Sequence, residues 1–133
     1  MCWFLHGALR GAVDENALQA INDKHLCHIA KGTRHDLKMT VLEDNWDYRV
    51  TNSYCDCECG IGRHDPNDEQ VVDLAALIAE VSALPGAKTL SLSMSWACTR
   101  NKHELSLKLS EVDLRQWLAD LKESTLYTIE LYS

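Results

Sequence analysis

Residues 90–96 carry the pattern that most restricts the fold, because apolar and hydroxyl side chains alternate there without interruption. The apolar positions are Leu90, Leu92, Met94 and Trp96, and the serines between them are Ser91, Ser93 and Ser95. Successive side chains of a strand point to opposite faces of a sheet, so the pattern predicts a strand with one buried face and one solvated serine face. An apolar sheet face needs a second layer to cover it, which points to helices packed on the sheet.

Three segments with apolar residues at helical spacing supply that layer. The first helix is expected between an N-cap at Asp14 and a C-cap at Gly32. The second is expected to begin at a capping box formed by Asn67 and Gln70, and to end near Leu84 before a Pro-Gly pair. The third helix follows a similar capping pattern, and its members are Ser110, Asp113, Leu114, Trp117, Leu118 and Leu121.

Apolar runs and alternation on either side of these helices predict the remaining strands. They cover residues 2–9, 37–41, 46–50, 105–109 and 127–131. The resulting order is β-α-β-β-α-β-β-α-β, and its first six elements match the split-βαβ, ferredoxin-like arrangement. We therefore expect an α+β fold that is partly ferredoxin-like. It has an antiparallel or mixed sheet of about six strands with three helices packed on one face, and it forms a single domain over residues 1–133.

Charge and cysteine usage narrow the classes of function and the compartment. The formal net charge is −7, which argues against a general nucleic-acid binder and against binding to an anionic membrane surface. No run approaches the roughly 20 apolar residues that span a bilayer, and the apolar start has no basic residue ahead of it, unlike a signal peptide. Six cysteines without such a signal favour reduced thiols, and hence a cytoplasmic protein.

The most distinctive local motif is Cys55-Asp56-Cys57-Glu58-Cys59, which contains half of the six cysteines. In an extended strand Cys55 and Cys59 would lie ~13 Å apart, whereas two sulfurs on one zinc ion are only ~4 Å apart. The chain would therefore have to curl after the motif, which Gly60 allows, and His64 would then be the next ligand within reach. The candidate metal ligands are thus Cys55, Cys57, Cys59 and His64, with zinc as the candidate cofactor.

Other possible ligands and the carboxylates near the cysteine motif help to distinguish a metal site, a thiol-redox site and a set of core cysteines. Further residues that could serve as ligands are His25, Cys27, His28, Cys98 and His103. Neighbouring carboxylates raise thiol pKa values, which disfavours a fast thiol-redox enzyme, whereas a bound divalent cation would reverse that effect. The cysteines could also be small hydrophobic residues of the core.

Three classes of function follow from these observations, and the sequence leaves the choice between them open. The first is a small acidic soluble domain that acts as a non-catalytic binding or interaction module, with a zinc site at the cysteine motif and a protein as its partner. The second is a cysteine-dependent or thiol-redox enzyme, with Cys57 or Cys59 as nucleophile and a histidine as base. The third is an acidic inhibitor-type protein that binds a basic partner. Catalytic residues and oligomeric state are not assigned.

Overall fold

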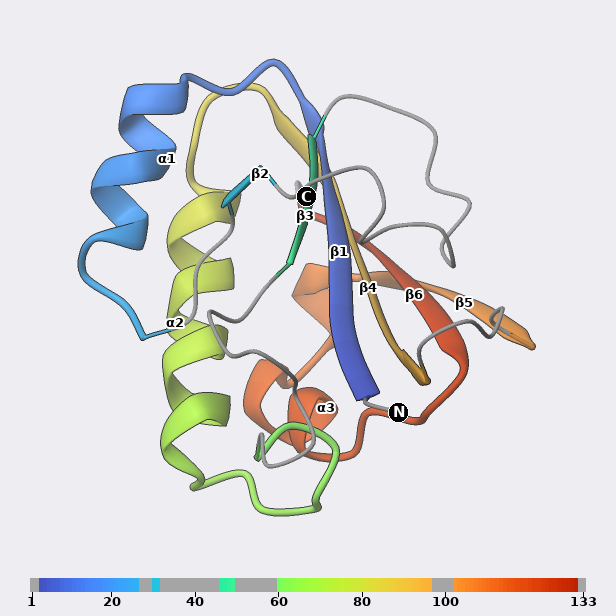
Figure 1. The fold of residues 1–133 in the computed structure, drawn as a ribbon. Coiled ribbons are helices and arrows are strands. Elements are labelled where there is room, and N and C mark those ends of the chain that lie inside the picture. Colours follow the sequence, from blue (N-terminus) through green and yellow to red (C-terminus); the bar gives the residue numbers. More distant parts are fainter. Residues whose placement is uncertain (1–2, 27–29, 32–45, 50–59, 97–101, 132–133) are drawn as a thin grey trace.

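A computed structural model describes residues 3–26, 30–31, 46–49, 60–96 and 102–131, and it has an α+β fold with a mixed sheet and three α-helices. In chain order the elements are β1 (Trp3–Gly11), α1 (Glu15–Asn22), β2 (Ala30–Lys31), β3 (Trp46–Arg49), α2 (Glu69–Ser82), β4 (Ala87–Trp96), β5 (His103–Lys108), the 3-10 turn η2 (Leu109–Glu111), α3 (Leu114–Ala119) and β6 (Thr125–Glu130) (Figure 1). The α+β class, the mixed sheet and the three helices were expected from the sequence.

The four longer strands form the main part of the sheet. β4 pairs antiparallel with β1 on one side and with β6 on the other, and β5 pairs parallel with β6. The two shorter strands continue the sheet beyond β1, giving the order β2-β3-β1-β4-β6-β5 (Figure 1). Among the described strands, β5 is therefore an edge strand, and its neighbour in the sheet is β6.

The core lies between the helices and one face of the sheet. The strand register aligns Leu9 of β1, Leu90 of β4 and Ile129 of β6 across three strands, and all three side chains are fully buried. Side chains of α1, α2 and α3 join the same apolar cluster, and α2 contributes the largest share of buried residues. The apolar stripe that predicts the second helix is this buried face of α2.

Helix ends differ from the sequence-based expectation at three places. α3 begins after Asp113, whose carboxylate accepts a hydrogen bond from the N–H of Gln116, whereas Ser110 of the predicted capping pattern lies in η2. α1 ends at Asn22, well before Gly32, because the backbone N–H groups of Lys24 and His25 donate to carbonyls only three residues back and the chain turns out of the helix. α2 is capped by Asp68 rather than Asn67, because the Asp68 carboxylate accepts hydrogen bonds from the N–H groups of the second and third helical residues.

The prediction that the serine face of residues 90–96 is solvated is wrong. Ser91 is 1% exposed and Ser93 is 0% exposed, although both lie on the face opposite the leucines. The Ser91 hydroxyl pairs with the Thr128 hydroxyl on the adjacent β6 at 3.3 Å, so a polar partner satisfies it inside the protein. The strand predicted at residues 37–41 lies outside the described residues.

Candidate functional site

The loop that precedes α2 carries the described part of the predicted metal site. Cys55, Cys57 and Cys59 lie outside the described residues, whereas the loop from Gly60 onward is held in place. The buried Gly60 donates its N–H to the side-chain oxygen of Gln70 at 2.7 Å. The N–H groups of Gly62 and His64 donate to the carbonyls of residues 118 and 119 at the end of α3, at 2.9 and 2.7 Å. The chain therefore turns directly after the cysteine motif, and its turn is anchored on two helices.

His64 stands out on this loop by its exposure and by its partner. Its side chain is 77% exposed, and its Nδ1 lies 2.9 Å from a carboxylate oxygen of Asp120. Hydrogen bonds from His64 and then from Gln116 hold the pKa of the Asp120 carboxyl below its usual value. When Nδ1 donates its proton to Asp120, Nε2 keeps its lone pair, which is the usual arrangement of a metal-binding histidine with a carboxylate behind it.

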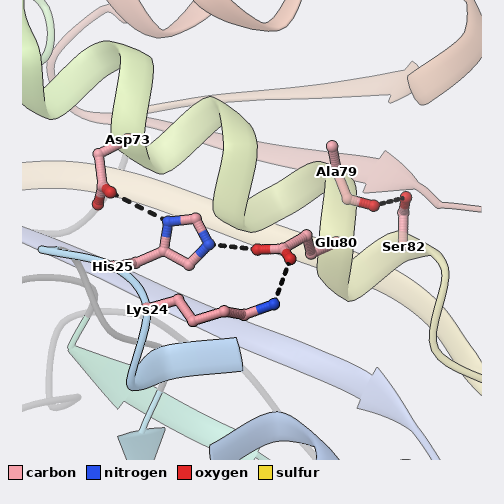
Figure 2. A network of polar contacts seen from close by, with 6 residues as sticks. All are labelled: Lys24, His25, Asp73, Ala79, Glu80 and Ser82. Atoms are coloured by element: carbon pink, nitrogen blue, oxygen red, sulfur yellow. Dashed lines mark hydrogen bonds and ion pairs between the residues drawn. The ribbon is translucent and has the colours of Figure 1, made fainter. Parts of the chain in front are cut away.

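The sequence predicts a metal site, but the described residues do not complete one. Across these ranges, no group of three histidine, cysteine or acidic side chains is placed to hold a metal ion. Of the further candidate ligands, Cys27, His28 and Cys98 lie outside the described residues, while His103 is exposed on β5. His25 is described and lies elsewhere, in the polar cluster shown in Figure 2.

The His25 cluster consists of Lys24, His25, Asp73 and Glu80 and ties the turn after α1 to α2 (Figure 2). The imidazole is 9% exposed, and its Nδ1 lies 3.0 Å from Asp73 while its Nε2 contacts Glu80. Lys24 binds the other oxygen of Glu80 at 2.7 Å. Asp73 and Glu80 are two helical turns apart, so they share one face of α2 and hold the ring from both ends.

The charged partners in the His25 cluster shift the pKa values of both His25 and Glu80. Burial opposes the charged imidazole, but the hydrogen bonds to Glu80 and Asp73 outweigh this effect and raise the pKa of His25 above its ordinary value. Hydrogen bonds from Lys24 and then His25 lower the pKa of Glu80. Carboxylates occupy both ring nitrogens, so neither nitrogen is open to a metal ion or to a substrate proton. We interpret the cluster as a structural tie.

The edge strand β5 is an open surface of the sheet. Its residues are exposed except for the half-buried Leu107, and Leu105 is 50% exposed (Figure 1 places β5 at the margin of the sheet). Beside it is a hollow of about 260 Å³ whose lining residues are Ser106, Leu107, Lys108, Glu111, Val112 and Glu130. This volume is below the ~300–1,000 Å³ typical of small-molecule sites.

Comparisons of the chain with protein-family models, with curated proteins and with solved structures found no match. In the part of the chain that the structure describes, no helix combines the length and the apolar character needed to cross a membrane.

Proposed function

We propose that this chain is a non-catalytic protein-binding module and that the open edge of β5 is its binding surface. The observation that supports this is the exposure of β5 along nearly its whole length, including the apolar side chain of Leu105. An edge strand presents a row of unpaired backbone N–H and C=O groups, which a further strand can join by β-augmentation. Side chains at alternate positions would then select the partner.

Peptide selection tests this proposal. Extended peptides selected from a displayed random library should bind the chain, and their affinity should fall at least about tenfold in the Ser106→Pro variant, since proline removes a ladder donor. The control is Val72→Ser on the exposed face of α2, which should bind the same peptides as the unchanged chain does. Selected peptides that bind both variants equally well would contradict a site at β5.

We further propose that zinc bound by Cys55, Cys57, Cys59 and His64 stabilises this module. The support is the exposed His64 ring with Asp120 behind its Nδ1, at the point where the chain turns after the cysteine motif. The enzyme and inhibitor interpretations stay predictions from the sequence alone.

Metal analysis tests the zinc proposal. Protein purified without chelator should contain one zinc ion per chain, and Asp120→Asn should weaken zinc binding by about tenfold or more, because it removes the charge that orients the histidine. Glu111→Gln, an exposed acidic residue on η2, is the control and should leave the affinity unchanged. A wild-type protein without metal would contradict the site.

We also propose the finer topology of the fold. The sheet has about six strands, and the first six elements of the chain follow a partly ferredoxin-like order. It is supported by the antiparallel pairing of β1 with both β3 and β4, and by the place of β2 beside β3. In that arrangement β5, α3 and β6 follow β4 along the chain, and β6 and β5 extend the sheet past β4.

A further inference from the structure

We propose that the strand bound by β5 is β5 of a second copy of this chain, paired antiparallel with Ser106 at the two-fold axis. This inference rests on the proposed function and names its partner. Two observations support it. Alternate residues of β5 direct their backbone N–H and C=O groups away from β6, and the charges on β5 pair with opposite charges when two copies of the strand lie antiparallel.

The backbone of β5 decides which residues can pair outward. The N–H of His103 donates to the carbonyl of Ser124, the residue before β6, at 3.2 Å, and the N–H of Lys102, just before β5, donates to the same carbonyl at 2.7 Å. Within the ladder, His103 is in register with Thr125, so its bond to the preceding carbonyl is the one that a parallel pair requires. In a parallel ladder, alternate residues direct both their N–H and C=O groups to the same neighbour. Residues 103, 105 and 107 therefore face β6, while Glu104, Ser106 and Lys108 present their peptide groups to the open side.

Only one register of two such strands pairs all three outward residues. With Ser106 opposite its own copy, Glu104 of each chain lies opposite Lys108 of the other, so each cross-strand pair joins opposite charges. A register centred on Glu104 or on Lys108 would oppose like charges and leave outward residues unpaired. Both Glu104 and Lys108 are exposed in the single chain, so their side chains are free to reach across.

The other face of β5 supports the same register. Leu105 and Leu107 lie in register with Tyr127 and Ile129 of β6, whose side chains are buried under the helices. In the proposed pairing Leu105 lies opposite Leu107 of the second copy, at a non-hydrogen-bonded position where side chains approach most closely. The half-exposed Leu105 would thus be covered by an apolar residue, while the charges meet on the opposite face.

The expected complex is a weak dimer, because one short strand buries less surface than a stable interface needs. Sedimentation velocity from micromolar to millimolar concentration should show a reversible monomer–dimer equilibrium. Ser106→Pro should abolish it, since the proline ring removes the donor nearest the axis.

Charge reversal tests the register. Glu104→Lys alone and Lys108→Glu alone should each weaken the dimer by about tenfold, because two cross-strand pairs become repulsive. An equimolar mixture of the two variants should restore dimers, since every cross-strand pair in the mixed dimer is again attractive. Far-UV circular dichroism of each variant checks that it folds, which matters for position 108 because Lys108 lies beside Glu130 in the ladder.

Amide hydrogen exchange gives a second readout that needs no variant. Raising the concentration should slow exchange at Glu104, Ser106 and Lys108, and leave the inward amides of residues 103, 105 and 107 unchanged. A monomer at all concentrations, a dimer insensitive to Ser106→Pro, or failure of the mixture to restore dimers overturns the inference. If such a chain still binds selected peptides through β5, the proposed function stands, and if it binds none, both fall.

Discussion

Replacing Gly60 by alanine should lower the free energy of unfolding by about 2 kcal/mol. An ideal Cβ at this position would lie 2.0 Å from Oδ1, 2.1 Å from Cγ and 2.3 Å from Oδ2 of Asp68. The same carboxylate caps α2, accepting hydrogen bonds from the N–H groups of Gln70 at 2.9 Å and of Val71 at 3.4 Å. Any movement that relieves the clash therefore uncaps the helix that contributes most to the core. Urea denaturation followed by circular dichroism measures the loss.

A double-mutant cycle separates this mechanism from general crowding. Asp68→Ala should cost about 1 kcal/mol on its own, through the lost cap. If Gly60→Ala acts by displacing this carboxylate, it should cost much less in the Asp68→Ala background, giving a coupling energy of about 1–2 kcal/mol. Additive effects would show that the added methyl group destabilises the chain without displacing the Asp68 carboxylate.

The parts of the fold that follow from local periodicity could be predicted from the sequence. The alternation at residues 90–96 marks β4, and the apolar stripe ending near Leu84 marks α2, because burial of one face leaves a direct trace in residue spacing. Exact cap positions leave a weaker trace. Asn67, Asp68 and Glu69 are neighbouring polar residues, and only the path of the loop makes Asp68 the one that reaches the helix N–H groups.

Long-range contacts could not be predicted, and they decide most of the candidate site. His25 fits the helical spacing of the preceding residues, but its partners on α2 lie 48 and 55 residues further along the chain. The Asp120 partner of His64 is likewise 56 residues away. The burial of Ser91 and Ser93 also escaped prediction, because a buried serine face has the same alternating sequence as a solvated one; Ser91 finds its hydroxyl partner on β6, far along the chain.

Replacing His25 by glutamine should destabilise the chain by about 2 kcal/mol near pH 6, where the variant loses charge-assisted hydrogen bonds to two carboxylates. The pKa of His25 is raised above its usual value of 6.5 in the folded chain. Its contribution to stability is therefore fully present below about pH 6.5 and is lost as the pH rises through the folded pKa. The pKa of Glu80 is lowered from 4.5, so its contribution is present above that pH and is lost as the pH falls through the folded value.

The difference in unfolding free energy between wild type and His25→Gln should therefore be largest between about pH 4.5 and 6.5, and should shrink on both sides. Taking the difference cancels the titration of the other histidines. Lys24→Gln is the matched control. It removes an exposed ion pair with the same Glu80 carboxylate and leaves the imidazole of His25 in place. It should cost less than about 1 kcal/mol and keep the wild-type decline above pH 6.5. A difference for His25→Gln that stays constant with pH would mean that His25 stabilises the contact between α1 and α2 by packing rather than by charge.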